Sequence, residues 1–364
     1  MKLGRSLLAG ILLGTLALAA QGERQEEQRR IQEIQAKIKQ GVQPTQEERQ
    51  FFKEVQARRR AEYAREHPPR ESTGLVPLPD LGNGTYSGEQ AGLYPGGESV
   101  APAPHWKAGL KLAREIVPLD TEGRRAKDGW IVLLSIGMSN TTMEFQAFQK
   151  LAADANGLNP RLKIVDGAQG GQTAAITANP QSHFWEVVSE RLGAAGVAAK
   201  QVEAAWIKQA NAGPTAPFPA EAKKLEADLV ETLHNLHDKF PNLKITYLSS
   251  RIYAGYAVTP LNPEPHAYET AFAVKWVIAG QMAGKPGLNF DPRKGTVRAP
   301  WTAWGPCLWA DGVKGRRQDS LVWLREDLAE DGTHPSMSGR EKVAKLLLDF
   351  FRSDATARPW FLAK

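Results

Sequence analysis

Short apolar runs alternate with longer amphipathic segments along the chain from residue 106 onward. The apolar runs predict strands at 130–136, 162–165, 202–208 and 243–249. The segments with helical periodicity lie at 142–153, 183–192, 220–240, 267–283 and 338–352. Short buried strands separated by helices are typical of a parallel sheet that is covered on both faces. We therefore expect an α/β fold, a three-layer α/β/α sandwich around a central, mostly parallel sheet.

Residues 21–66 are dominated by Gln, Glu, Arg and Lys, with few apolar positions. Ile31, Ile34 and Ile38 recur at the spacing of one helix face. After a break at 41–45, Thr45 and Glu48 have the spacing of a capping box that opens a second helix. The pattern predicts an N-terminal helical extension, a charged hairpin that serves either as a solvated spacer or as an interaction element.

Residues 67–105 are rich in Pro and Gly, which indicates an irregular segment. Because this segment also carries Tyr86, Leu93 and Tyr94, we expect it to be a linker that packs on the core. The main domain is then predicted at 106–364, with an insertion at about 251–325.

The chain begins with a basic segment and an apolar run that ends near residue 20. This pattern predicts a cleavable signal peptide over residues 1–20, because the run is too short to span a membrane. We expect a secreted or periplasmic protein with no integral membrane insertion after cleavage. The single cysteine, Cys307, leaves no intramolecular disulfide to form.

The net charge of +6 reflects 46 basic against 40 acidic residues, and the basic residues form no patch interleaved with aromatics. This argues against nucleic-acid binding. His234 and His237 are close on a charged helix, but a third ligand is missing nearby, so we expect neither a metal site nor another cofactor.

Residues with catalytic potential follow the ends of the predicted strands, where ligands gather in parallel sheets. Ser139 follows the first strand and opens a helix, where it is either a nucleophile or a helix cap. Gly170 and Gly171 follow the second strand and either donate N–H groups to a ligand or form a plain turn. Asn211 follows the third strand and is either a neutral donor for an oxyanion or a turn former before Gly-Pro.

Asp331 and His334 lie three residues apart, just before the last predicted helix. This spacing brings a carboxylate next to an imidazole with little demand on the rest of the fold. His334 could accept a proton from Ser139, while Asp331 orients the ring and stabilises the imidazolium ion.

These four segments, in this order, resemble the SGNH superfamily of GDSL-type esterases over roughly residues 128–350. The resemblance implies a flavodoxin-like SGNH hydrolase fold with Ser139 as nucleophile, His334 as base and Asp331 as its partner. It also implies an oxyanion hole made by the N–H groups of Ser139 and Gly171 and the side chain of Asn211. The Asp before the family's serine is Met138 here, and the segment around Asn211 also departs from the family's pattern.

The predicted insertion is rich in aromatic residues, and the Trp-rich run 300–309 resembles a loop. We expect Arg251, Tyr253, Trp304 and Trp309 to bind substrate, since exposed indoles suit the apolar faces of sugars; core packing is the other interpretation. The hypothesis is an esterase that removes short acyl groups, chiefly acetyl, from a small-molecule or glycan ester. An inactive carbohydrate-binding or scaffold protein on the same fold is the alternative, and a peptidase or thioesterase is a third possibility.

Overall fold

The computed structural model describes residues 25–34, 36–37 and 42–363. They divide into two units, one up to Arg65 and one from Glu66 onward. The predicted signal peptide and Ile38 lie outside the described residues.

The N-terminal unit contains a helix over residues 25–34 and 36–37 and the longer α2 (Gln46–Glu66). The predicted capping box of α2 is present, because Glu48 N–H donates to Thr45 Oγ1 and Thr45 N–H donates to Glu48 Oε2, at 3.1 and 2.9 Å. Glu27 on the first helix forms ion pairs with Arg58 and Arg59 on α2. This unit is thus built mainly from charged side chains, as its composition predicts.

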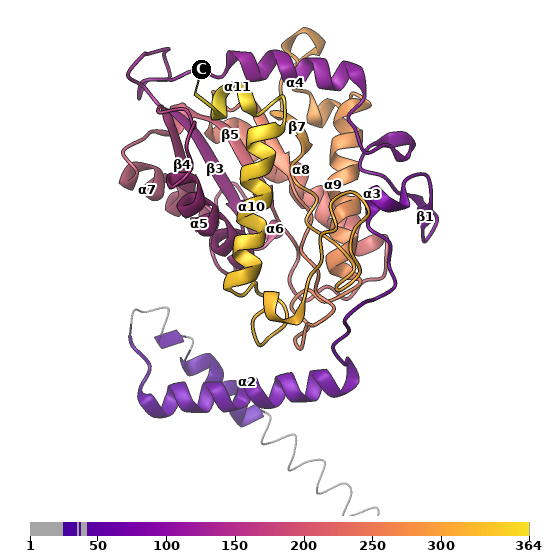
Figure 1. Cartoon of the computed structure of the whole chain (residues 1–364). Helices are drawn as coiled ribbons and strands as arrows, with labels where there is room; N and C mark the ends of the chain where they lie inside the picture. The colour runs from indigo at the N-terminus through magenta and orange to yellow at the C-terminus, as the bar shows by residue number, and fades with distance from the viewer. Residues whose placement is uncertain (1–24, 35, 38–41, 364) are drawn as a thin grey trace, which may run out of the picture. The chain divides into compact units, whose positions relative to one another are not determined.

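The second unit is built on a five-stranded sheet in which every pair of neighbouring strands is parallel. Its strands are β3 (Ile131–Gly137), β4 (Leu162–Asp166), β5 (Val202–Lys208), β6 (Ile245–Leu248) and β7 (Trp301–Trp304). Their order in the sheet is β4-β3-β5-β6-β7, the flavodoxin-like order 2-1-3-4-5 (Figure 1). The predicted three-layer α/β/α sandwich is confirmed.

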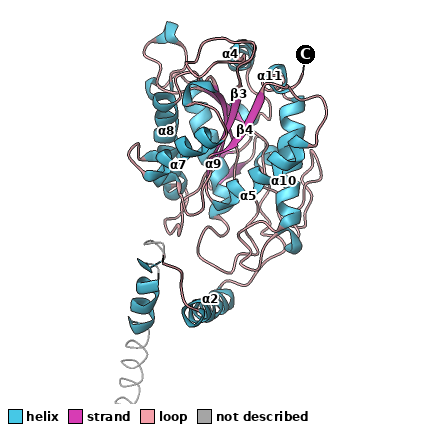
Figure 2. Cartoon of the chain, turned by 90° about the vertical axis from the view of Figure 1, so that its left-hand side faces the viewer, coloured by secondary structure: helices cyan, strands magenta, loops and turns pink. Residues whose placement is uncertain are grey.

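Helices cover both faces of the sheet, with α5 and α10 on one side and α7 and α8 on the other (Figure 2). The long helices are α4 (Ala103–Glu115), α5 (Ser139–Ala153), α7 (His183–Ala194), α8 (Ala220–Lys239), α9 (His266–Met282) and α10 (Met337–Ser353). Short helices are α3 (Leu78–Leu81), α6 (Ala174–Ala178) and α11 (Arg358–Phe361), with 3-10 turns at Pro95–Gly97, Ala199–Gln201, Pro286–Leu288, Pro292–Lys294 and Arg325–Asp327. No described helix combines the length and the apolar character that a membrane span requires.

The run 300–309, expected to be a loop, contains the fifth strand, β7. Its register pairs Ile245 with Trp301 and Leu248 with Trp304. Helix α4 packs directly on Trp301, since a Cβ added to Gly109 would lie only 2.4 Å from the indole ring. The loop interpretation holds for 305–309 but was wrong for 301–304, because β7 is defined by its partner β6 and by the cover from α4, neither of which is local in sequence.

Residues 67–102, here called the strap, lie against the sheet domain and include the short hairpin of β1 (Thr85–Tyr86) and β2 (Glu89–Gln90). Asp311 accepts hydrogen bonds from the strap residues Ser72, Thr73 and Gly74 at 2.5 to 3.0 Å. Further along, Lys275 donates to the carbonyl oxygens of Gln90 and Ala91. Side chains of the core therefore bind backbone groups of the strap at two places.

Candidate active site

Ser139, His334 and Asp331 form one hydrogen-bonded chain at the carboxyl ends of the strands. Ser139 is the first residue of α5, directly after β3, and its Oγ lies 2.8 Å from His334 Nε2. The other ring nitrogen of His334, Nδ1, lies 2.6 Å from Asp331 Oδ2. The serine and the histidine are both partly exposed. The chain can therefore move a proton from a reachable hydroxyl to an imidazole that a carboxylate holds in place.

Asp331 is held as an anion by its hydrogen bonds. Its Oδ1 accepts the backbone N–H groups of Thr333 and His334, each at 3.0 Å. Burial raises the pKa of Asp331, but the bonds from the His334 ring and from the two N–H groups outweigh it and lower the pKa to about 2. The carboxylate is thus charged at neutral pH.

The start of α5 is anchored to two other segments by the residues after Ser139. Asn140 Nδ2 donates to the carbonyl oxygen of Thr333 at 2.9 Å, and Thr141 Oγ1 donates to that of Lys208 at 2.7 Å. Asn140 therefore fixes the histidine segment beside the serine. The sequence alone did not single out Asn140, because its partner is 193 residues away and leaves no local pattern.

The loop after β4 brings Gly170 and Gly171 to Ser139. A Cβ on Gly170 would lie 4.0 Å from that of Ser139, while Gly171, with φ of 76°, would have open space around its Cβ. The N–H groups of both glycines are without a hydrogen-bond acceptor among the described residues. Donors without an acceptor beside a nucleophile can stabilise an oxyanion.

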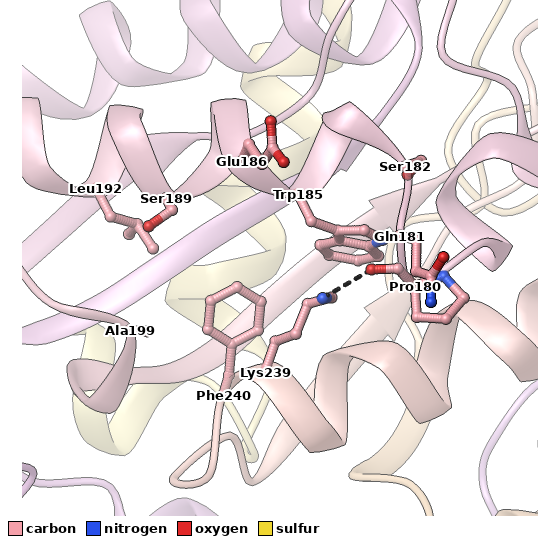
Figure 3. A pocket seen from close by; sticks show the side chains of 10 residues that line it. All are labelled: Pro180, Gln181, Ser182, Trp185, Glu186, Ser189, Leu192, Ala199, Lys239 and Phe240. Carbon is pink, nitrogen blue, oxygen red and sulfur yellow. Dashed lines mark hydrogen bonds between the residues drawn. The ribbon is translucent and has the colours of Figure 1, made fainter.

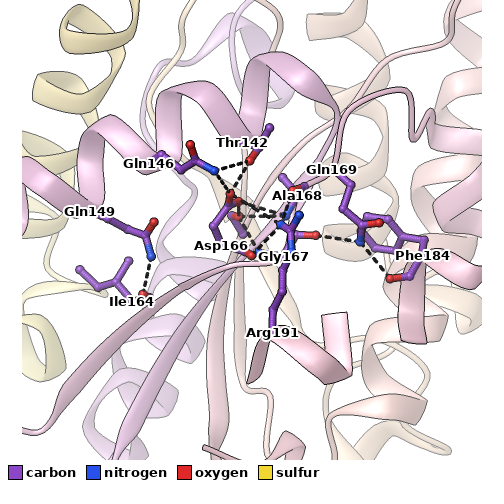
Figure 4. A network of polar contacts seen from close by, with 11 residues as sticks. Thr142, Gln146, Gln149, Ile164, Asp166, Gly167, Ala168, Gln169, Phe184 and Arg191 are labelled. Carbon is purple, nitrogen blue, oxygen red and sulfur yellow. Dashed lines mark hydrogen bonds and ion pairs between the residues drawn. The ribbon is translucent and has the colours of Figure 1, made fainter. Parts of the chain in front are cut away.

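Asp166, at the end of β4, organises this loop together with the start of α5 (Figure 4). Its carboxylate accepts bonds from Ser135 Oγ at 2.6 Å, from Thr142 Oγ1, and from the backbone N–H of Ala168 at 3.1 Å. Gln169 N–H donates to the carbonyl oxygen of Gly137 at 3.0 Å. The glycines are thus supported by a polar network that joins β3, β4 and α5.

Asn211 follows β5 and is 6% exposed. Its side-chain nitrogen donates to Glu221 Oε1 at 3.0 Å, and its backbone carbonyl oxygen accepts from Asn262 Nδ2 at 3.1 Å. The amide nitrogen carries two protons, so one remains for another acceptor.

Below the site, the core contains a buried ion pair between α5 and β5. Lys208 Nζ lies 2.5 Å from both carboxylate oxygens of Glu144, and both side chains are buried. Burial raises the pKa of Glu144 and lowers that of Lys208. Nearby electrostatic partners of Glu144 include Arg251.

The four residues expected to bind substrate are all in the interior, which contradicts the expectation of exposed platforms. Tyr253 and Trp309 are 0% and 1% exposed, and Trp304 is 5% exposed. Their polar atoms donate to Arg70 O, Glu264 Oε1 and Leu93 O, respectively. Arg251 is 2% exposed, and its Nε and Nη2 are buried without a hydrogen-bond partner. The aromatic side chains pack beneath the strap, a long-range contact that composition does not reveal.

Three hollows of ligand size lie on the surface, and one of them, of about 380 Å³, lies where the end of α4 meets α11. A groove of about 670 Å³ between α5 and α10 has Met143, one turn after Ser139, and Met337, three residues after His334, at the end where both helices begin. A pocket of about 370 Å³ lies between α7 and the end of α8, where Trp185 and Phe240 flank Lys239 (Figure 3). Ser139, Asp331 and His334 line none of these hollows; the groove between α5 and α10 is the one whose lining includes residues next to them in sequence, Met143 and Met337. Among the described residues, no cluster of His, Cys, Asp and Glu could hold a metal ion.

Comparison with known proteins gives only distant similarity. No family model matches the chain, and no curated protein matches its sequence. The Bacillus subtilis protein YxiM aligns with a TM-score of 0.33 and 11% identity over 63% of this chain, which spans 59% of that structure. The periplasmic domain of a lipopolysaccharide acetyltransferase from Salmonella Paratyphi A aligns with a TM-score of 0.32 and 13% identity, over 68% of this chain and 95% of that one. At these scores the site has to be judged by its own geometry.

Proposed function

We propose that this chain is a serine ester hydrolase of the SGNH type. The observation that carries the proposal is the continuous hydrogen-bonded chain from Ser139 Oγ through His334 to Asp331. A serine hydroxyl is a weak nucleophile until a neighbouring base accepts its proton, and here the base is itself held by a carboxylate.

In the first half of the reaction, His334 Nε2 takes the proton of Ser139 as Oγ attacks the ester carbonyl. The negative charge on the carbonyl oxygen is met by N–H groups of Ser139, of Gly170 or Gly171, and of the Asn211 side chain. His334 then gives the proton to the leaving alcohol as its bond to the acyl carbon breaks. Water attacks the acyl-Ser139 ester by the reverse route and releases the acid.

Short acyl groups, acetyl first, are the proposed substrates. Because Trp304 and Trp309 are buried, they are not available to stack on a sugar. A sugar acetate is therefore tested beside a simple aryl acetate. We further propose export through the predicted signal over residues 1–20, which N-terminal sequencing of the mature protein would check.

Turnover of p-nitrophenyl acetate and of peracetylated glucose by wild type and Ser139→Ala tests the proposal. We expect Ser139→Ala to lose at least about 10³-fold in kcat/KM on whichever ester is a substrate. A fluorophosphonate probe should label Ser139 alone. Wild type that neither turns over an ester nor reacts with the probe would support the inactive scaffold instead.

A further inference from the structure

The side chain of Asn211 has a partner that the hydrolytic mechanism above does not use. Glu221, in the first turn of α8, accepts a hydrogen bond from Asn211 Nδ2 at 3.0 Å. An oxyanion hole needs a nitrogen, not an oxygen, aimed at the developing charge, and an amide side chain can present either. The group that fixes the orientation of this amide therefore decides whether Asn211 adds a third donor to those of Ser139 and the glycine loop.

Glu221 can make that selection because a carboxylate only accepts hydrogen bonds. It attracts the Nδ2 end of the amide and repels the Oδ1 end, so a rotation of Asn211 by half a turn about its last bond is disfavoured. The backbone of Asn211 is fixed separately, by Asn262 Nδ2 on its carbonyl oxygen at 3.1 Å and by the adjacent bond from Gly213 N–H to Leu261 O at 2.8 Å. With the backbone held, the last side-chain bond is the freedom that remains for Glu221 to restrict.

Glu221 is not placed to bind substrate itself. The cavity that it shares with Asn211, Asn262 and Thr270 has a volume of only about 10 Å³. That is about the room of one water molecule, too small for an acyl group or an alcohol. Through this cavity, Glu221 can act on the reaction only by way of its neighbours.

We propose that Glu221 is a positioning residue, which holds the Asn211 amide so that its second N–H is left for the oxyanion. This inference rests on the proposed hydrolase function. A purely structural role is the alternative. A carboxylate in the first turn of α8 interacts favourably with the helix dipole, and this interaction does not depend on Asn211.

A double-mutant cycle with p-nitrophenyl acetate separates these roles. We expect Glu221→Ala to lower kcat about 10- to 100-fold with KM within about two-fold, since an oxyanion donor is worth roughly 10²- to 10³-fold. Glu221→Gln, which has the same shape and keeps an acceptor but can also present a donor, should fall between Glu221→Ala and wild type. In an Asn211→Ala background, Glu221→Ala should change kcat less than about two-fold, because the group through which it acts is gone.

Glu231→Ala is the matched control, since Glu231 lies on the same helix and is 60% exposed, away from Asn211; it should retain wild-type kcat. Thermal unfolding of each variant identifies loss of folded protein, and Glu221→Gln keeps the cycle usable if Glu221→Ala does not fold. Equal losses from the Glu221 change with and without Asn211 would overturn the inference, as would kcat at or above wild type in both Glu221 variants. If wild type turns over esters and Ser139→Ala does not, either result counts against Glu221 alone. If wild type is inactive, the hydrolase proposal fails and the inference fails with it.

Discussion

Two carboxylates near the same end of the sheet are each paired with a basic side chain, and their surroundings differ. Asp331 is at the site, with its side chain 17% exposed, and accepts backbone N–H groups in addition to the His334 ring. Glu144 is fully buried, and both of its oxygens face Lys208. Burial tends to raise the pKa of both acids, but the added donors lower that of Asp331 to about 2, whereas the pKa of Glu144 stays raised. Backbone donors beyond the paired side chain thus keep Asp331 charged, whereas Glu144 has only the buried Lys208 as a hydrogen-bond donor among the described residues.

Breaking the site pair should affect activity far more than stability. Asp331→Asn keeps the size of the side chain but removes the charge that fixes the His334 tautomer, so we expect kcat/KM to fall about 10³- to 10⁴-fold. Initial rates with p-nitrophenyl acetate measure the loss. The control is Asp349→Asn, which changes an exposed acid paired with Lys345 on α10 and should have wild-type rates. Retained activity in Asp331→Asn would show that the carboxylate is not part of the mechanism.

Breaking the core pair should have the opposite profile. Glu144→Gln leaves Lys208 buried without a counter-ion, which we expect to lower the free energy of unfolding by about 3–5 kcal/mol in urea titrations. Replacing both partners, as in Glu144→Leu with Lys208→Met, should recover most of this loss because no charge is then left uncompensated. A Glu144→Gln protein as stable as wild type would mean that Lys208 finds another partner or loses its proton.

The two pairs should also respond differently to acid. Because the pKa of Asp331 is lower in the folded protein than its ordinary 3.8, its stabilisation is complete above about pH 4 and is lost as the pH falls toward 2. We expect wild type to lose about 2 kcal/mol more than Asp331→Asn over this range, as measured by urea unfolding at successive pH values. Glu144 has the opposite effect. Because its pKa is raised in the folded protein, its contribution to the free energy of unfolding decreases as the pH rises above its ordinary pKa of 4.5. Parallel pH curves for wild type and Asp331→Asn would contradict the assignment.

A smaller effect is expected at the network that supports the glycine loop. Asp166→Asn retains one acceptor but weakens the bonds from Ser135, Thr142 and Ala168, so we expect kcat to fall roughly five-fold, equivalent to about 1 kcal/mol. Gln149→Ala is a suitable control, because Gln149 donates to the backbone carbonyl oxygen of Ile164 in β4 and not to the carboxylate of Asp166. No change in kcat would mean that the loop keeps its shape without the carboxylate.

The parts of the fold that could be predicted from sequence are those with a local signal. Strand β5 has the predicted bounds, 202–208, because a short, mostly apolar segment between two helical segments favours a buried strand. Asp331 and His334 are adjacent in space because they are three positions apart in sequence, and Ser139 joins them because it follows a strand that ends at the same edge of the sheet. The contact of Asn140 and the burial of Trp304 and Trp309 depend on contacts between distant segments. Periodicity and spacing carry no information about such contacts.

The strap has a consequence for the order in which the protein can be completed. Its anchor Asp311 follows Ser72 by 239 residues, and His334 follows Ser139 by 195. On a ribosome that makes the chain from its N-terminus, the strap waits with unpaired backbone groups until the last part of the sheet domain has been made. Closing such long loops is slow, because their entropy is lost before the contacts that reward it can form. The same late segment brings both Asp311 and His334, so newly made protein stays without the hydrogen bonds from Ser139 to His334 and Asp331 until the sheet domain is closed.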